Sequence, residues 1–545
     1  MMGLSDHLII LPILIPFFAG AIMLLYDDRQ RKAKLGISLV ATLATLVVAI
    51  ELLNRSKGNA LSGGNDIAFY LLGDWAVPYG IILVIDRLSA MMLVLTSLLA
   101  IPALLYSGAG WHRQGQNFQS LFMFLLMGLN GAFLTGDLFN LFVFFEVLLA
   151  ASYGLLLHGS GQLRVRAGLH YIAMNLAASL LFLVGVSLIY GVTGTLSMAQ
   201  LSNLVATVPD ADRPLLHVGT AMLGIAFLVK AGIYPLSFWL PTAYMAGSAP
   251  VAAMFAIMTK VGIYIILRIT MLVFGAGAGS SAGFAAEVLV ALGLATIAYG
   301  SFGVLASQGL GRVTGHLVMI SSGTLLTVNG LALMGGGIGM LAGALYYLVG
   351  STLATGALFL LIEPLSREEG GIAAMLALTA DAYGLDQSDE DSTEQDEEGL
   401  AIPGVMTILG LLFGVCLLML AGMPPLAGFI GKLGILGGAM SAPALPAALV
   451  WVFVALVIVS GLASLLALVR IGIQTFWAAD GTPPRVLASE IAPIGVLAGL
   501  VILMTIQGQD IFRYMEATSR ALHAPEIYVQ GVIEAPRVVD GGDRP

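Results

Sequence analysis

Apolar stretches of about 20 residues follow one another along most of the chain, separated by short polar connections. A stretch of this length matches the hydrocarbon core of a bilayer, so we predict about fourteen transmembrane helices. Their approximate ranges are 7–26, 34–53, 81–106, 118–136, 138–158, 169–190, 215–240, 249–275, 285–307, 312–334, 338–363, 401–440, 447–475 and 488–508. The stretch 401–440 is too long for one straight span, and Gly422-Met423-Pro424-Pro425 predicts a break within it.

The composition supports an all-α polytopic membrane protein. Hydrophobic residues make up 58% of the chain and charged residues only 10%, whereas soluble proteins carry about 25% charged residues. The first apolar stretch has no basic region and no small-residue cleavage site, so we expect a span and not a signal peptide. A single cysteine, Cys416, excludes an intrachain disulfide framework. We find no P-loop, Rossmann fingerprint or HExxH motif, so we predict no cofactor, no metal ion and no nucleic-acid partner.

The acidity of the chain belongs to one loop. Residues 381–398 hold nine carboxylates and no Lys or Arg, which accounts for the whole net charge of −9. Basic residues such as Arg29, Arg31, Lys32 and Lys34 gather in alternate connections. The positive-inside rule then predicts non-cytoplasmic termini, with the acidic loop cytoplasmic and disordered. The segment after Gln509 is too polar to span, so we expect a surface tail.

Three of the six lysines, Lys230, Lys260 and Lys432, lie inside apolar stretches. A charged side chain at the bilayer centre costs roughly 2.5–3.5 kcal/mol on insertion scales, so such residues usually mark proton or ion paths. The alternatives are structural. Lys230 and Lys432 could snorkel to the interface, and Lys260 could bond a carbonyl of a neighbouring helix.

Glu146 is the most deeply placed carboxylate of the chain. A buried carboxylate stays ionised only when it is paired, so we predict an ion pair with one of the three lysines. The pattern leaves open which lysine this is, and a protonated, passive Glu146 is the alternative. We predict that Asp137 caps the helix beginning at Leu138. Five further residues could bridge the lysines through water or make ordinary interhelical hydrogen bonds: His316, Tyr153, Ser321, Ser322 and Thr355.

A short internal repeat lies beside two of these lysines. Residues 231–237 (AGIYPLS) resemble residues 421–427 (AGMPPLA), and each segment interrupts an apolar stretch close to a lysine. Pro235 lacks an amide hydrogen, so the carbonyl of Ala231 loses its helical partner and needs a polar group or water. Paired interrupted helices in two halves of a chain indicate a transport site.

These residues resemble a known family, the antiporter-like membrane subunits shared by multisubunit Mrp cation/proton antiporters and respiratory NADH dehydrogenase. The segments that carry the resemblance are 136–146 (GDLFNLFVFFE), 227–244 (FLVKAGIYPLSFWLPTAY), 256–262 (AIMTKVG) and 421–432 (AGMPPLAGFIGK). It covers about residues 1–508. The sequence around Glu146 and the segment from Gly73-Asp-Trp to Asp86-Arg-Leu-Ser89 look most like the D-type subunits of Mrp antiporters.

The resemblance implies fourteen helices with two inverted five-helix repeats, each containing one broken helix. The implied divisions are N-terminal helices at 1–117, the first repeat at 118–275, the second repeat at 276–475 with the acidic loop, the last helix at 476–508 and the tail at 509–545. It further implies that Glu146 pairs with Lys230, that Lys260 is the central relay and that Lys432 ends the path. Relatives carry a histidine or lysine where this chain has Gly350, Thr355 and Ser321, so we expect water, Ser and Thr to continue the relay.

Three functional hypotheses follow. The first is a proton-translocating subunit of a Na⁺/H⁺ antiporter, a secondary transporter and not an enzyme, working with other subunits in the bacterial inner membrane. The second is a proton-pumping, non-redox subunit of a respiratory NADH:quinone oxidoreductase. The third is a passive scaffold in which the buried lysines only join helices.

Overall fold

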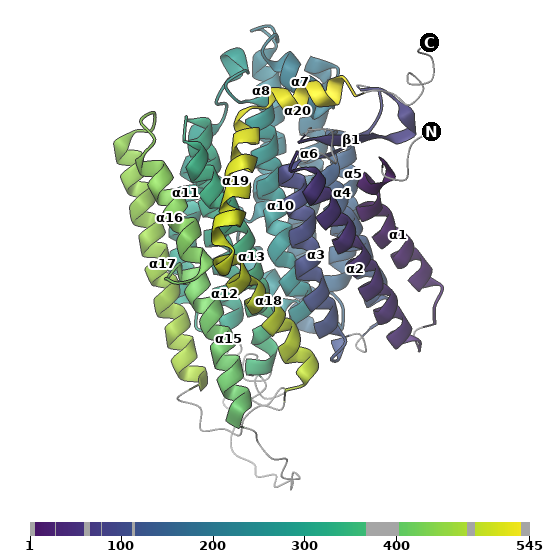
Figure 1. The fold of residues 1–545 in the computed structure, drawn as a ribbon, viewed down its shortest axis with the longest axis vertical. Helices are drawn as coiled ribbons and strands as arrows, with labels where there is room; N and C mark the ends of the chain where they lie inside the picture. The colour runs from purple at the N-terminus through teal and green to yellow at the C-terminus, as the bar shows by residue number, and fades with distance from the viewer. Residues whose placement is uncertain are drawn as a thin grey trace.

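The computed structural model describes residues 6–27, 29–58, 66–77, 79–111, 115–366, 403–476 and 486–535. These residues form a bundle of helices with one small β-hairpin (Figure 1). Within the described ranges, 12 helices are long and apolar enough to cross a membrane, and three shorter apolar helices have 14 to 17 residues. The prediction of an all-α polytopic membrane protein is confirmed. The predicted count of fourteen spans is not, because several apolar stretches end early or break.

The helices of the first half are α1 (Leu11–Leu24), α2 (Arg31–Arg55), α3 (Arg87–Ser107), α4 (Phe118–Leu134), α5 (Leu138–Leu156), α6 (Gln162–Thr193), α7 (Met198–Val205), α8 (Arg213–Ala231), α9 (Leu240–Ala246) and α10 (Ala249–Val273). Those of the second half are α11 (Ala286–Ala306), α12 (Leu310–Leu333), α13 (Ile338–Ser366), α15 (Pro403–Ala421), α16 (Ala427–Met440), α17 (Ala447–Phe476), α18 (Ala488–Ile506), α19 (Gly508–His523) and α20 (Glu526–Ile533). Strands β1 (Ala68–Leu71) and β2 (Ile82–Ile85) pair antiparallel, with Ala68 opposite Ile85.

The two ends of the bundle differ. The β-hairpin, α7 and α20 gather at one end, which we call the hairpin end (Figure 1). At the opposite end, here the loop end, α13 finishes at Ser366 and α15 begins at Pro403. The predicted acidic loop 381–398 lies outside the described residues.

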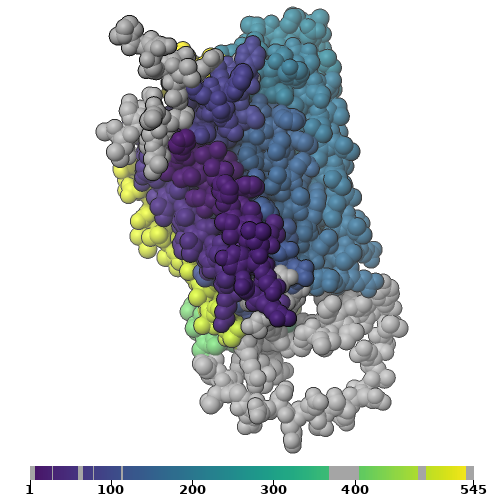
Figure 2. Space-filling view, turned by 90° about the vertical axis from the view of Figure 1, so that its right-hand side faces the viewer, coloured from purple at the N-terminus to yellow at the C-terminus, as the bar shows by residue number. Residues whose placement is uncertain are grey.

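The core of the bundle is centred on α10, in which every residue is buried. Helices α3, α8, α12 and α13 pack around it. The outer helices keep one apolar face exposed, with side chains such as Val40, Leu180 and Trp451. Figure 2 shows the N-terminal helices, in purple, on the outside of the bundle beside the blue middle segment. Exposed apolar faces around a buried central helix suit a protein surrounded by lipid.

Both predicted helix breaks are present. Helix α8 ends at Ala231, and Gly232 follows with φ +67° before the chain turns into α9. Helix α15 ends at Ala421, and Gly422 follows with φ +77° before α16. Glycine suits these positions because the left-handed conformation is strained for other residues. Helix α8 therefore ends before Pro235, although the sequence pattern attributes the break to that proline.

The segment predicted as a surface tail is helical in its described part. Helix α19 is amphipathic and buries Met515, Thr518, Ser519 and Leu522. The Ser519 hydroxyl donates to the carbonyl of Ile338 at 2.9 Å, at the start of α13. The segment thus covers the hairpin end of the core. The division into two inverted repeats and the domain boundaries stay predictions.

Candidate functional site

Lys230 lies in the last turn of α8 and is buried, with 6% of its surface exposed. Its ammonium group has no hydrogen-bond partner among the residues that the structure describes, and it stands 4.9 Å from the ring centroid of Phe145. A cation over an aromatic face is stabilised by the ring quadrupole. A lysine held in this way is buried but not fixed by any polar contact.

Glu146 is half-buried on α5, the helix that also carries Phe145. Its carboxylate accepts a hydrogen bond from the Ser179 hydroxyl of α6 and acts electrostatically on Lys230. The two side chains make no direct ion pair, because the Lys230 ammonium has no polar contact in the described chain. The structure therefore brings Glu146 and Lys230 into one neighbourhood without joining them.

Lys260 lies near the middle of α10 and is almost completely buried, at 1% exposure. Its ammonium donates to the hydroxyls of Ser321 at 2.9 Å and Ser322 at 3.3 Å, both on α12. The Ser321 hydroxyl is in turn 2.9 Å from the Ser351 hydroxyl on α13. Lys260 thus contacts the oxygens of hydroxyl groups, whose protons can exchange, and these groups link α10 through α12 to α13.

Lys432 is buried on α16, at 8% exposure. Its ammonium donates to the carbonyls of Ala421 at 2.9 Å and Leu420 at 3.3 Å. These carbonyls end α15, where the break removes their helical partners. The freed carbonyls of this second break thus meet a polar group, whereas the expectation for the Ala231 carbonyl at the first break stays a prediction. Snorkelling does not describe Lys432, because its charge is turned to backbone inside the bundle.

Tyr347 connects the neighbourhoods of Lys260 and Lys432. Its side chain lies near Ser321 without a hydrogen bond to it in the described chain, and its ring faces the Lys432 ammonium at 5.9 Å from the centroid. The backbone of Tyr347 packs directly on Gly431, where an added Cβ would come within 3.1 Å of it. Tyr347 therefore lies between the Lys260–Ser321 contact and Lys432, and we call Lys260, Ser321, Tyr347 and Lys432 the polar series from α10 to α16.

The other predicted residues differ in whether they contact the buried lysines. Ser321 and Ser322 contact Lys260, and Asp137 caps α5 by accepting from the amide of Asn140 at 2.8 Å. The Thr355 hydroxyl bonds the Ser351 carbonyl of its own helix. The two others are set apart from the series: the ring of His316 bonds a carbonyl of its own helix, and the buried hydroxyl of Tyr153 has no hydrogen-bond partner in the described chain.

Sequence reasoning missed Tyr347, Ser351 and Ser179. Tyrosine and serine are ordinary in membrane helices, where serine usually joins neighbouring helices. One signal was available, since Tyr347 and Ser351 are four residues apart and so share a face of α13. Gly350 points elsewhere, because an added Cβ there would meet Met419 at 2.2 Å.

The arrangement defines a class: a helical membrane protein with buried cationic and hydroxyl groups connected inside the bundle between two broken helices. Comparisons with known proteins support this class. The family model described as "NADH:quinone oxidoreductase/Mrp antiporter, TM" matches residues 135–460. The chain belongs to this family.

Several proteins are similar to it along nearly their whole length. A probable K⁺/H⁺ antiporter D subunit of Rhizobium meliloti is 54% identical over 539 residues, or 98% of each chain. A Na⁺/H⁺ antiporter D subunit of Bacillus subtilis is 31% identical, covering 97% of this chain and 100% of that one. Among solved structures, a chain of the Mrp complex from Dietzia sp. DQ12-45-1b aligns with a TM-score of 0.80 at 25% identity, covering 98% of this chain and 100% of that chain.

Proposed function

We propose that this chain is the proton-translocating membrane subunit of a multisubunit monovalent cation/proton antiporter, a transporter subunit and not an enzyme. The names of the similar proteins support the class. The observation that carries the mechanism is the hydrogen-bonded group of Lys260, Ser321 and Ser351, with Tyr347 placed between this group and Lys432. Protons move along groups that can both donate and accept, and hydroxyls do both.

In the proposed cycle, Lys230 is the movable charge. It has no hydrogen-bond partner in the described chain, and Glu146 is the nearby carboxylate that can attract it. Moving toward Glu146 pairs the two charges, whereas moving away leaves a positive charge free inside the bundle. Because like charges repel, a free Lys230 ammonium favours loss of the proton from Lys260. Glu146 and Lys230 thus act as a switch and Lys260 as the relay.

The released proton passes along the hydroxyls. Lys260 gives a proton to the Ser321 oxygen while the Ser321 hydroxyl releases its own proton toward Ser351, the hydroxyl to which it is hydrogen-bonded. Tyr347 stands between Ser321 and Lys432. Lys432, fixed by the carbonyls of Leu420 and Ala421, is the terminal site of the series.

The exchanged cation is to be tested as K⁺ and as Na⁺. The sequence resemblance favours Na⁺, but the relative named as a K⁺/H⁺ antiporter subunit shares 54% identity, against 31% for the one named as a Na⁺/H⁺ subunit. The partners in this proposal are the other antiporter subunits, the lipid bilayer and the transported protons and cations. The proposed location is the bacterial inner membrane, with the hairpin end on the non-cytoplasmic side, which is also the side predicted for both termini.

The test is transport by the whole complex in inside-out vesicles, read as the collapse of a preformed pH gradient after adding K⁺ or Na⁺. We expect Lys260→Ala to abolish exchange while the complex assembles normally. Lys57→Ala, which removes an exposed lysine outside the core, is the control and should retain exchange. Full activity of Lys260→Ala would overturn the proposal. Loss of transport only in proportion to lost assembly would favour the scaffold hypothesis.

A second candidate function is the proton-pumping subunit of an NADH:quinone oxidoreductase, because the matching family includes both kinds of complex. The same residues would serve, driven by electron transfer in other subunits. Purification of the assembly separates the two functions. Steady NADH oxidation coupled to proton uptake supports the second candidate, and cation-dependent exchange without NADH oxidation supports the first.

A further inference from the structure

A buried ion pair near the hairpin end is not used by the proposed relay. Arg268 of α10 and Asp86, the residue that precedes α3, are 6% and 9% exposed. The guanidinium makes two hydrogen bonds to the carboxylate, one of them at 2.8 Å. Asp86 also accepts from the amide and hydroxyl of Ser89. Removing two charges from water is costly, so this pair persists only because its geometry is nearly fully satisfied.

The pair is connected to Lys260 by helix geometry. Lys260, Tyr264 and Arg268 are spaced by four residues, so they lie along one face of α10. Arg268 donates to the Tyr264 hydroxyl at 3.1 Å, and that hydroxyl donates to the carbonyl of Phe133 at 2.7 Å. One hydrogen-bonded set therefore fixes α10 to the start of α3 and the end of α4, about two turns from the central relay.

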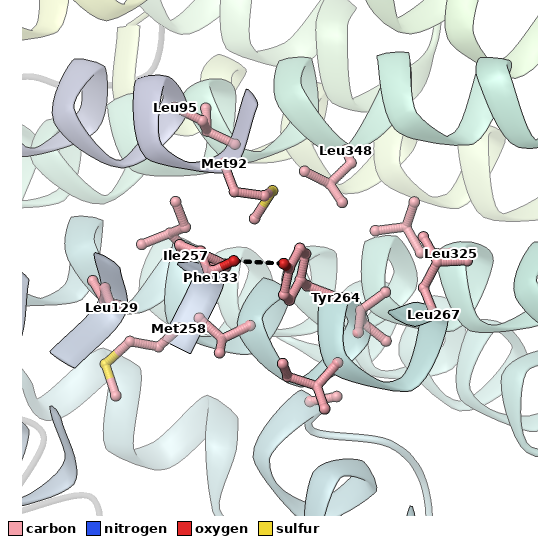
Figure 3. Close-up of a cluster of buried hydrophobic side chains, with 14 of the residues drawn as sticks. Met92, Leu95, Leu129, Phe133, Ile257, Met258, Tyr264, Leu267, Leu325 and Leu348 are labelled. Carbon is pink, nitrogen blue, oxygen red and sulfur yellow. Dashed lines mark hydrogen bonds between the residues drawn. The ribbon is translucent and has the colours of Figure 1, made fainter. Parts of the chain in front are cut away.

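The surroundings of Tyr264 are apolar. Figure 3 shows its hydroxyl bonded to the Phe133 carbonyl inside a cluster that includes Met92, Leu95 and Leu348. These three side chains are 0–2% exposed. Buried apolar packing of this kind leaves no polar partners for water. Between Lys260 and Arg268 the face of α10 is therefore dry apart from the Tyr264 hydroxyl.

The other side of the pair faces a cavity with both polar and apolar lining residues. The cavity has a volume of about 40 Å³, and its lining combines Asp66, Asp86, Arg87, Arg268 and Tyr528 with apolar side chains. A cavity of that size can hold water where such polar partners line it. Arg87 pairs at 3.2 Å with Asp66, whose partly exposed side chain connects the cavity lining with the surface. The Tyr528 ring of α20 lies over the Arg268 guanidinium at 5.2 Å from the centroid. The pair thus stands between this cavity, which has polar lining residues, and the apolar cluster around Tyr264.

We propose that Asp86, Tyr264 and Arg268 form a hairpin-end gate, which separates Lys260 from water at that end as long as its hydrogen bonds are made. The gate rests on the proposed proton function of Lys260. Opening requires the Tyr264 hydroxyl to leave the Phe133 carbonyl and the Arg268–Asp86 bonds to loosen. These residues are positioning residues, because they control access and do not receive the relayed proton.

The test measures proton flux that does not depend on the exchanged cation. The whole complex is placed in proteoliposomes loaded with a pH dye, in choline buffer without K⁺ or Na⁺, and a pH step is imposed. We expect Tyr264→Phe, which keeps the ring and removes the hydroxyl, to raise this flux several-fold at normal assembly. Asp86→Asn should raise it further. Tyr346→Phe is the control, since Tyr346 also donates to a backbone carbonyl, that of Met504 at 2.7 Å.

Each outcome supports or overturns the gate. A cation-independent flux that stays at the wild-type value in assembled Tyr264→Phe and Asp86→Asn complexes overturns it. So does a Tyr264→Phe complex that fails to assemble when Tyr346→Phe assembles, because Tyr264 would then be structural. Failure of the underlying proton function is seen separately, as absence of cation-dependent exchange in the wild-type complex.

Discussion

The two helix breaks have similar local sequences, but the ammonium groups of their lysines make different contacts. At the second break, the Lys432 ammonium donates to two carbonyls that the break sets free. At the first break, the Lys230 ammonium has no hydrogen-bond partner in the described chain and rests over the ring of Phe145. Both lysines are buried. One charge is therefore held in place and the other is held only by electrostatics.

The direction of the side chain explains the difference. In an α-helix every Cα–Cβ bond tilts toward the N-terminus of the helix. Lys230 precedes its break, near the end of α8, so its side chain leans away from the freed carbonyls. Lys432 follows its break, on α16, so its side chain leans back toward them. A lysine that follows a break is therefore fixed by the freed carbonyls, whereas a lysine that precedes a break stays movable.

The largest expected effect tests this contrast directly. Lys230→Met and Lys432→Met should each lower cation-dependent proton exchange by at least roughly tenfold, equal to about 1.4 kcal/mol of barrier. Their effects on stability should differ, with a loss expected only for Lys432→Met. Lys432→Met leaves two buried carbonyls without a donor, at about 1–3 kcal/mol each, whereas Lys230→Met removes an unbonded buried charge.

Thermal unfolding of the purified complexes measures the second half of this prediction. The unfolding temperature of Lys432→Met should fall below that of wild type, and that of Lys230→Met should stay level or rise. Equal losses of stability in both variants would show that the two lysines are held alike.

The sequence indicated the two helix breaks and the buried lysines, but not the contacts that each lysine makes. Apolar length predicted the helices, and the AGIYPLS and AGMPPLA segments predicted both breaks, since glycine and proline act locally. Glu146 and the three lysines stood out because charge is rare at membrane depth. Ser321, Ser351 and Tyr347, by contrast, come together from α12 and α13. That meeting depends on how helices rotate against each other, which no local pattern states.

A second contrast concerns the glycines of the breaks. Gly422→Ala and Gly232→Ala both place a side chain at a positive φ, which costs roughly 1–2 kcal/mol. An added Cβ at Gly422 would meet the Lys432 side chain at 2.5 Å, whereas one at Gly232 would meet Leu240 at 2.3 Å. We expect both variants to lose stability, and Gly422→Ala to lose several-fold more transport per assembled complex. Equal transport per complex would contradict a fixed role for Lys432.

A smaller effect is expected within the polar series. Ser321→Ala removes the 2.9 Å contact with Lys260 and the link to Ser351. A hydrogen bond contributes net about 1 kcal/mol, so exchange should fall by about three- to fivefold. Ser322→Ala is the matched control, because the contact of Ser322 with Lys260 is longer, at 3.3 Å. Initial rates of exchange in vesicles measure both, and an equal response would remove Ser321 from the path.

The smallest effect concerns the carboxylate side of the first break. The Ser179 hydroxyl donates to Glu146 and so holds the carboxylate on the α6 side. Ser179→Ala frees Glu146 to approach Lys230, which should stabilise the pair of charges and slow its separation by about twofold. This change is smaller than the net free-energy contribution of one hydrogen bond. Ser187→Ala on the same helix, where the hydroxyl bonds the Leu183 carbonyl, should leave the exchange rate unchanged. Initial exchange rates of the two variants measure this difference. If Ser179→Ala instead speeds exchange, the distance between Glu146 and Lys230 limits the rate of the cycle. Ser179 of α6 would then control Lys230 by holding Glu146 away from it.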